Sequence, residues 1–359
     1  MSLFESLPVD RAVVSTALRA HWGLELGALL RASQNHTFAA AVPATGAQFA
    51  VRVVPDPHAR HHARVAAEAA FVSWLAGPGA LAGACAPMPP SLPPAAAAAA
   101  SPALRVGPYT LVVMPWAPGA MLDYAALRWA TDAAVVEQCG AWLARLHAAS
   151  RAFSAAHPAA SAAMRRWDEL HGGVMTGAPL HPDDAAAQAA ACAAPSGTSH
   201  SFLILHADLN VGNFHVEEEE AAAAAGGCGG GGGGLRLHVF DWDQCARGWA
   251  ELDLAHAAGM VAMLQEGGMP PGGAPVPAAD VGAYLRGLVR GYEAVAGAGA
   301  IDAARLDRLL QLRKLFFARF TQRALEDAAT PEPVRAAMAY NAAWLARAPP
   351  RVEGWVCSS

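Results

Sequence analysis

LILHADLNVGNFHV at residues 203–216 and LHVFDWD at residues 237–243 are two apolar runs that each end in oxygen-bearing side chains. Their β-branched and aromatic residues predict two short strands with a polar loop after the first. The loop carries Asp208 and Asn213, and the second run delivers Asp241 from a separate strand. No single helix could bring these three side chains together, so the pattern predicts a composite site.

The chemistry of this site follows from its donors, because oxygen ligands suit Mg²⁺ bound to phosphates. Phosphoryl transfer needs a group that orients the acceptor hydroxyl and cations that offset charge on the donor. We expect Asp208 to orient the hydroxyl and Asn213 and Asp241 to hold Mg²⁺. Asp208 and Asn213 could instead only cap turns. The spacing His-x-Asp-x4-Asn, followed by an aspartate on a strand, favours the site.

Composition narrows the function classes. The chain has 359 residues, enough for two lobes with sizeable cores, and a formal net charge of -5. Proteins that bind nucleic acid usually need a basic surface, so that partner is disfavoured. The six cysteines have no metal-ligand or scaffold spacing, which fits a reducing compartment. Without a signal peptide or an apolar run long enough to span a bilayer, we expect a soluble cytoplasmic protein with no membrane partner.

The first hundred residues predict a small antiparallel lobe. Residues 9–30 show helical spacing with Asp10 as N-cap and Gly23 ending the helix, and the segment 27–54 then reads as a meander. Arg52 lies on its last strand, and Glu68 lies in a helix predicted over residues 58–76. The two side chains form either a cation and its partner, or an exposed strand charge and a solvated helix face.

The Pro-, Ala- and Gly-rich segment at about residues 77–102 predicts a loosely held connection. The strand at 109–116 follows and meets a stiff Ala-Pro-Gly turn, which predicts a hinge between lobes whose backbone could hydrogen-bond a flat heterocycle. Periodicity alone also allows a plain core strand. The polar loop at residues 33–37 is likewise compatible with an ordinary surface hairpin.

The remainder reads as mostly helical. A helix over 132–150 is core scaffold in which His147 is a structural residue, and the region 151–201 continues as a helical insertion. The acidic and glycine-rich tract at about 217–234 predicts a long hairpin tip, whose four adjacent glutamates are solvated and form no metal cage. The sequence thus predicts an N-terminal nucleotide-binding lobe at 1–116 and a C-terminal helical catalytic lobe at 117–359. Further helices are expected at 281–295, 302–325 and 333–347.

HADLNVGN at residues 206–213 resembles the HGDLHxGN catalytic loop of the aminoglycoside phosphotransferase and choline kinase-like family, and VFDWD at 239–243 resembles its IDFD or IDWD segment. The order of the other parts agrees over about residues 25–325. The run from Asp241 to Ala255 is most similar to the homoserine kinase and stress-response kinase branch. The resemblance implies an α+β, protein kinase-like bilobal fold with a small sheet lobe, one main helix in that lobe, and a larger helical lobe.

Residue by residue, the resemblance implies Asp208 as the catalytic aspartate, with Asn213 and Asp241 as metal ligands. Asp243 contacts a second metal or the acceptor, and Asp253 braces the catalytic loop. Nucleotide contacts are implied for Arg52 on the phosphates, Glu68 orienting Arg52, Asn35 in the nucleotide loop, and Met114 and Trp116 at the hinge. Ala207 replaces the usual Gly, Asn210 the usual His, and Arg52 the Lys of many kinases.

The implied function is an ATP- and Mg²⁺-dependent kinase that phosphorylates a hydroxyl of a small polar metabolite, of amino alcohol or sugar type. Two alternatives remain open at this point. One is a protein Ser/Thr kinase of the stress-response type, and the other is a nucleotide-binding pseudokinase. The pseudokinase would be favoured if Arg52 failed to approach Glu68, or if Asn213 and Asp241 were far apart.

Overall fold

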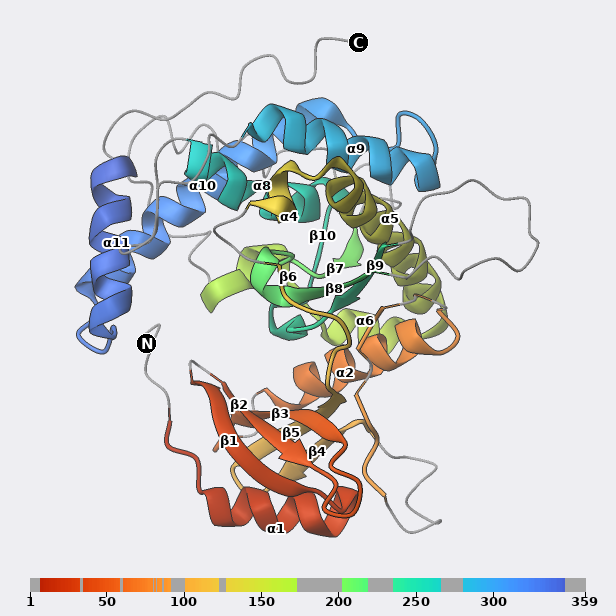
Figure 1. The fold of residues 1–359 in the computed structure, drawn as a ribbon, viewed down its shortest axis with the longest axis vertical. Coiled ribbons are helices and arrows are strands. Elements are labelled where there is room, and N and C mark those ends of the chain that lie inside the picture. Colours follow the sequence, from red (N-terminus) through yellow and green to blue (C-terminus); the bar gives the residue numbers. More distant parts are fainter. Residues whose placement is uncertain are drawn as a thin grey trace. The chain divides into compact units, whose positions relative to one another are not determined.

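A computed structural model describes residues 7–32, 35–58, 61–79, 81, 83–85, 87–91, 101–122, 127–172, 202–218, 235–265 and 280–345. The chain forms two compact units, each described here by itself (Figure 1). Unit 1 comprises Met1–Ala117 and Ala152–Met164, and unit 2 comprises Pro118–Arg151 and Arg165–Ser359. Most of the two predicted low-complexity loops, and the predicted insertion beyond residue 172, lie outside the described residues.

Unit 1 is built on a five-stranded antiparallel sheet with strand order β1-β2-β3-β5-β4. Its first three strands are the predicted meander, and the turn between β2 and β3 contains Gly46 at φ +71°. The fourth strand in sequence was not predicted, because it directly follows the Pro- and Ala-rich segment. The strands are β1 (Glu25–Ala32), β2 (His36–Ala41), β3 (Gln48–Pro55), β4 (Ala103–Val106) and β5 (Tyr109–Pro115).

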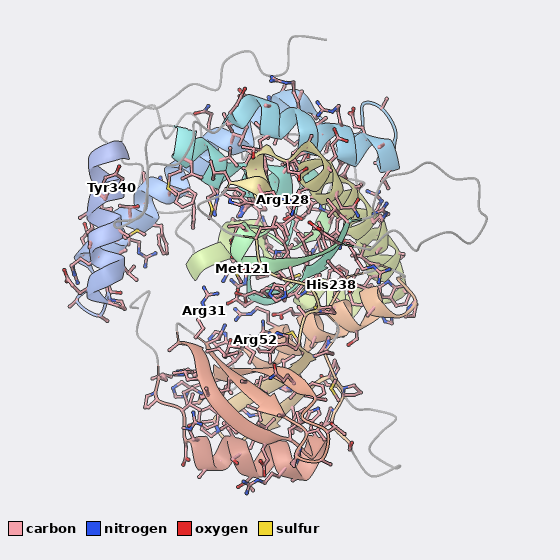
Figure 2. All side chains as sticks on the ribbon, viewed as in Figure 1. Arg31, Arg52, Met121, Arg128, His238 and Tyr340 are labelled. Carbon is pink, nitrogen blue, oxygen red and sulfur yellow. The ribbon has the colours of Figure 1, made fainter. Side chains whose placement is uncertain are left out.

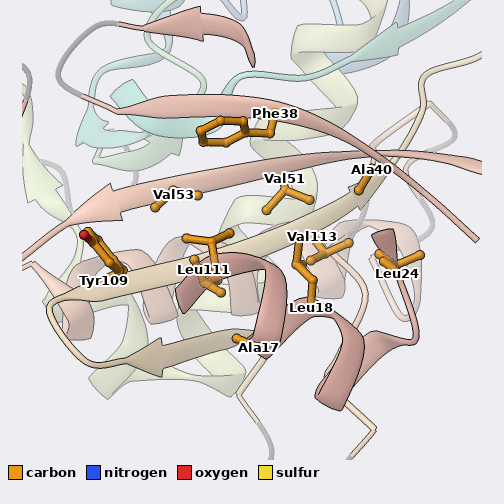
Figure 3. Packing of buried hydrophobic residues seen from close by; sticks show 11 residues of the cluster. Ala17, Leu18, Leu24, Phe38, Ala40, Val51, Val53, Tyr109, Leu111 and Val113 are labelled. Atoms are coloured by element: carbon orange, nitrogen blue, oxygen red, sulfur yellow. The ribbon is translucent and has the colours of Figure 1, made fainter. Parts of the chain in front are cut away.

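One helix covers each face of this sheet. Helix α1 (Arg11–Trp22) places Val14 and Leu18 in a buried cluster with Val51 and Leu111 (Figure 3). Helix α2 (His62–Ala76) packs Val65 and other small side chains on the opposite face. The side chains of β3 therefore alternate between the two faces, with Val51 and Val53 on one face and Val54 on the other.

Aspartates fix the starts of α1 and α2. Asp10 accepts hydrogen bonds from the backbone N–H groups of Ala12 and Val13, as predicted. Gly23 ends α1 in the left-handed conformation, so the helical spacing predicted beyond it was wrong and residue 25 begins β1. At α2, Asp56 accepts from the backbone N–H groups of His61 and His62, at 2.8 and 3.0 Å.

An aromatic cluster explains why Ala152–Met164 belongs to unit 1. Phe153 makes an edge contact with Phe71 of α2 at a centroid distance of 5.1 Å, and His157 makes one with Trp74. The segment Ala152–Met164 contains the end of α5 (Ala133–Ala156) and all of α6 (Pro158–Ala163). The aromatic area buried there stabilises this segment against α2.

Unit 2 is mostly helical and supports two small sheets. Strands β6 (Arg165–Arg166), β10 (Ala246–Gly248) and β7 (Leu203–Leu205) form one, and the hairpin of β8 (Phe214–Glu218) and β9 (Leu235–Val239) forms the other. Its helices include α4 (Arg128–Thr131), α8 (Ala250–Gln265), α9 (Val281–Ala296), α10 (Ala303–Glu326) and α11 (Glu332–Leu345). The last three of these were predicted near the C-terminus. Among the helices described, none has the length and apolar character needed to cross a membrane.

Helices α5 and α9 touch backbone to backbone at two glycines. A Cβ placed on Gly140 of α5 would fall on the carbonyl oxygen of Leu288, and one on Gly291 of α9 would fall on that of Glu137. Side chains larger than hydrogen would push the helices apart. This contact sets the separation of the two helices that carry His147 and Tyr292.

We expect Gly291→Ala to destabilise the protein by about 2 kcal/mol or more, because overpacking outweighs the gain of about 1 kcal/mol that helix propensity alone would give. Urea unfolding measures the change. Ala294→Gly on the exposed side of α9 is the control, and it should cost only about 1 kcal/mol. A neutral or stabilising Gly291→Ala would show that the helices are not in contact here.

Candidate active site

The loop after β7 turns back on itself through local hydrogen bonds. Asn210 caps the 3-10 helix Val211–Asn213, because its Oδ1 accepts from the N–H of Gly212 at 2.9 Å. Its Nδ2 donates to the main-chain oxygen of Asp208 at 3.1 Å. The asparagine that replaces the family's usual histidine thus shapes the turn between Asp208 and Asn213.

Asp208 and Asn213 are in direct contact. The Nδ2 of Asn213 donates to the carboxylate Oδ2 of Asp208 at 2.9 Å and to its main-chain oxygen at 2.8 Å. Because its amide nitrogen faces Asp208, the amide oxygen of Asn213 points elsewhere, and no described residue donates a hydrogen bond to it. That oxygen has the chemistry of a ligand for a hard cation.

The Asp241 segment lies beside this loop through strand pairing. Phe214 pairs with Val239 in the hairpin, and the N–H of Phe240 donates to the carbonyl oxygen of Asn213 at 3.0 Å. Asp241 follows in the left-handed conformation (φ 62°, ψ 60°) and leads into the 3-10 helix Trp242–Gln244. The two sequence motifs are therefore adjacent in unit 2, as the sequence predicted.

Burial and charge set the ionisation of Asp208. Burial raises the pKa of its carboxyl, and the nearby charge of Asp243 raises it further. The charges of Arg313 and His206 and a hydrogen bond from Asn210 oppose this increase. The net rise in pKa makes Asp208 a stronger base than an exposed aspartate, which suits a group that accepts a proton from an alcohol.

His206 connects the two motifs. Its ring is buried, with centroids 4.7 Å from Trp242 and 6.5 Å from Trp142. Burial lowers its pKa, so the ring is neutral. Nε2 donates to the carbonyl oxygen of Phe240 at 3.0 Å, and Nδ1 accepts from the N–H of Asp208 at 3.3 Å. These bonds fix the tautomer and hold the loop against the Asp241 segment.

Asp253 of α8 braces the backbone of the same loop, as the family resemblance implied. Its Oδ1 accepts from the N–H of Ala207 at 2.6 Å, and its Oδ2 accepts from the N–H of His206 at 3.1 Å. Oδ2 also accepts from Nε2 of the buried His147 at 2.9 Å. His147 Nδ1 lies 3.0 Å from the hydroxyl of Tyr292, which confirms the structural role predicted for this histidine.

The bracing explains an irregularity at Ala207. This residue has φ 61°, in the left-handed region that glycine adopts most easily. The alanine that replaces the usual glycine therefore carries backbone strain of about 1 kcal/mol or more. The two hydrogen bonds to Asp253 at this point of the loop hold it in place.

In unit 1, Arg52 and Glu68 form a buried ion pair. Nη2 of Arg52 (labelled in Figure 2) lies 2.6 Å from Oε1 of Glu68, with side chains 4% and 8% exposed. Arg52 sits on β3, opposite Thr37 of β2 and Val112 of β5. The pairing considered from the sequence is present, and the surrounding sheet and α2 fix the guanidinium in one position.

The other predicted nucleotide contacts also lie in unit 1. Asn35 directly precedes β2 and is half-buried. Met114 is opposite Ala50 in the sheet and packs against the cluster beneath α2. The Trp116 side chain is 43% exposed, and its N–H donates to the carbonyl oxygen of Gln48 at 3.2 Å. That N–H is engaged, so it does not serve as a free donor for a heterocycle in this conformation.

Two arginines near the site were not singled out from the sequence. Arg165 of β6 donates from Nη1 to Oε1 of Gln244 at 3.0 Å and from Nη2 to the main-chain oxygen of Asp243 at 3.2 Å. It anchors the segment after Asp241. Arg313 of α10 lies close enough to Asp208 for their charges to interact. Arg313 had a signal in the sequence, because it falls on the apolar stripe of its helix.

The donor set fits a hard divalent cation. Within the described ranges, no group of three or more His, Cys, Asp or Glu side chains is arranged around one point. The candidate ligands instead combine the amide oxygen of Asn213 with the carboxylates of Asp241 and Asp243. All three supply oxygen atoms. Because the amide nitrogen of Asn213 contacts Asp208, its amide oxygen points away from Asp208. Such a set suits Mg²⁺ better than zinc.

Comparison with known proteins places the chain in a family. The model of the phosphotransferase enzyme family matches residues 28–298, about three quarters of the chain. The match includes both motifs of the site as well as Arg52 and Glu68. The chain belongs to the phosphotransferase enzyme family. No curated protein matches its sequence significantly.

Solved structures share the fold. A protein from Ralstonia eutropha JMP134, described as a candidate aminoglycoside phosphotransferase, has a TM-score of 0.54 at 15% identity, with 95% of this chain and 99% of that chain covered. Plasmodium vivax ethanolamine kinase scores 0.50 at 9% identity (91% and 86% covered). Choline kinase from Cryptosporidium parvum Iowa II scores 0.50 at 10% identity (92% and 94% covered). The kinase-like α+β fold predicted from the sequence is confirmed.

We expect Asp253→Asn to destabilise the protein by about 3 kcal/mol or more. An asparagine presents an NH₂ group where Asp253 accepts hydrogen bonds, so at least one buried N–H of the loop loses its acceptor. Thermal unfolding measures the loss. Asp280→Asn is the matched control, because Asp280 is an exposed N-cap and asparagine caps equally well. Equal Tm values for the two variants would contradict the bracing role.

Proposed function

We propose that this protein is an ATP- and Mg²⁺-dependent kinase that transfers the γ-phosphoryl group to a hydroxyl of a small polar metabolite, of amino alcohol or sugar type. The observation that carries the proposal is the contact of Asp208 with Asn213 next to the Asp241 segment, within the range that matches the phosphotransferase family. Membership of the family gives the reaction class. The geometry supplies residues for each part of the reaction.

Asp208 is the proposed catalytic residue. Its raised pKa suits a carboxylate that accepts the proton of the attacking hydroxyl as the bond to phosphorus forms. Asn213, Asp241 and Asp243 would hold the cation. Mg²⁺, when bound there, offsets negative charge on the transferring phosphoryl group. Asn213 also fixes the carboxylate of Asp208, so one side chain positions the base and offers a metal ligand.

Arg52 is the proposed ligand of the donor phosphates, and Glu68 orients it. Glu68 holds the guanidinium in a fixed orientation, and the planar fork of a guanidinium matches phosphate oxygens. Asn35, Met114 and Trp116 are proposed to contact the nucleotide from unit 1. In this proposal, residues 1–116 bind the nucleotide and residues 117–359 carry the catalytic groups, in a cytoplasmic enzyme.

Neither of the two observations that would favour the pseudokinase alternative is made. Arg52 approaches Glu68 in a short ion pair. The main-chain oxygen of Asn213 accepts a hydrogen bond from Phe240, the residue before Asp241, so the two segments lie side by side. For the acceptor, the names of two structural neighbours, ethanolamine kinase and choline kinase, favour small amino alcohols.

Asp208→Asn should lower kcat by about 10²- to 10⁴-fold, the usual contribution of a positioned base. The assay incubates purified protein with ATP and Mg²⁺ against a panel of hydroxylated metabolites and measures ADP and phosphorylated product. Asp280→Asn serves as the control, since Asp280 lies at an exposed helix start. Equal turnover by Asp208→Asn and the unaltered protein would remove Asp208 from the catalytic role.

Replacement of the Arg52–Glu68 pair should raise the KM for ATP by about tenfold or more, because charge-assisted hydrogen bonds to phosphate are lost. A single Arg52→Met change would leave the carboxylate buried without its partner, so the double variant Arg52→Met/Glu68→Met is the cleaner test of binding. Arg52→Lys is the matched control that keeps the charge. The KM for the acceptor should not change. An unaltered ATP KM in the double variant would exclude a phosphate contact.

A further inference from the structure

Arg313 is a buried cation that the proposed chemistry does not use. It lies in the middle of α10, a helix that packs along α8, and is only 7% exposed. Its Nε and Nη1 are buried and have no hydrogen-bond partner in the part of the chain that the structure describes. Buried arginines usually form ion pairs or several hydrogen bonds. If this position in α10 needed only to pack, an apolar side chain would be more favourable there than arginine.

The surroundings of Arg313 hold it in place without using its donors. The guanidinium carbon lies 4.4 Å from the ring centroid of Phe316 and 4.6 Å from that of Phe317. Gly259 of α8 faces the aliphatic part, where an added Cβ would lie 3.1 Å from the Cγ of Arg313. Cation–π contacts engage the flat face of a guanidinium and leave the N–H groups along its edges. The side chain is thus fixed while its hydrogen-bonding capacity remains unused.

The charge of Arg313 is only partly balanced by Asp208. Burial lowers the pKa of the guanidinium to about 10, and the attraction of Asp208 recovers only part of that decrease. Arg313 therefore stays charged at neutral pH at a cost in stability. Asp208 already accepts hydrogen bonds from Asn213. A ligand anion near Asp208 and Arg313 would accept hydrogen bonds from the N–H groups of Arg313 that the described residues leave without acceptors.

We propose that Arg313 binds an anionic group of the phosphoryl acceptor, a carboxylate or a phosphate, so that the acceptor is a hydroxylated acid or a phosphorylated polyol. This inference rests on the proposed function. Its basis is the position of an orphaned, fixed guanidinium near the carboxylate that would receive the acceptor's proton. In this proposal, a small molecule binds with its anion at Arg313 and its hydroxyl at Asp208. The proposal narrows amino alcohol or sugar acceptors to those that also carry negative charge.

The first arm of the test measures stability in the absence of ligands. Arg313→Met keeps the length and apolar packing of the side chain and removes the charge. If Arg313 is kept for a ligand, the variant should melt no lower than the unaltered protein, because the burial cost of the charge outweighs its partial balance by Asp208. A lower Tm would show that Arg313 stabilises the fold itself and would overturn the proposal.

The second arm measures specificity with acceptors that share one carbon skeleton: glycerol, glycerate, glycerol 3-phosphate and 3-amino-1,2-propanediol. The unaltered protein should prefer glycerate or glycerol 3-phosphate, and the preferred one tells carboxylate from phosphate. Arg313→Met should lower kcat/KM for that acceptor at least about 30-fold more than it does for glycerol. Arg313→Lys, which keeps the charge, should retain part of the preference.

Three outcomes overturn the inference while leaving the proposed kinase intact. They are a preference for glycerol or the amine, an equal loss with all acceptors in Arg313→Met, and no effect of that variant. If none of the four compounds is phosphorylated, the anion site is tested by ligand binding, measured as a shift in Tm. A rise in Tm with glycerate or glycerol 3-phosphate that disappears in Arg313→Met supports the anion site, and no rise contradicts it. Failure of the proposed function shows separately, as absent ATP binding and absent phosphoryl transfer to every hydroxylated metabolite.

Discussion

The candidate site depends on one buried carboxylate, that of Asp253. It accepts two backbone hydrogen bonds from successive residues of the loop after β7 and a third from His147. Carboxylates are rarely buried completely unless their oxygens are hydrogen-bonded, and here both oxygens are. The loop is thereby held in a conformation that its own sequence resists, since Ala207 occupies a left-handed position. A bond network in the helical part thus fixes where the side chain of Asp208 emerges.

A second layer of hydrogen bonds connects the two motifs that bear the polar side chains. His206 donates to the carbonyl of Phe240, and Phe240 donates to the carbonyl of Asn213. The second bond uses the main-chain oxygen of Asn213 and not its side-chain amide oxygen, so the backbone is positioned without engaging that candidate ligand atom. Sites built from loops need such support, because a shift of about 1 Å can remove most of the rate enhancement.

Much of this arrangement follows from local sequence patterns. Asp10 and Gly23 mark the ends of the first helix, and the alternation of Val51, Arg52 and Val53 places the cation on the α2 side of the sheet. The hairpin motif brings Asn213 beside Asp241 because strand pairing is local. Long-range choices are different. Nothing near Asp56 shows that it caps α2 across a loop, and Gly291 looks like a weak helix position until its contact with Glu137 is known. The same holds for Phe153, whose ring joins the end of α5 to α2.

Two buried arginines show why burial alone does not define a role. Arg52 lies within 2.6 Å of Glu68, so much of its charge is compensated inside unit 1 before any ligand arrives. Arg313 has aromatic faces on its flat side and two buried nitrogens without acceptors among the described residues. A compensated cation is pre-oriented, because its partner removes the alternatives open to a long side chain. A cation that is only partly compensated stores unfavourable free energy that an anion can release on binding, and that release appears as affinity and selectivity. We therefore infer that Arg52 is oriented by its partner Glu68. Arg313, which has no such partner in the described part of the chain, is the residue that recognises an anion.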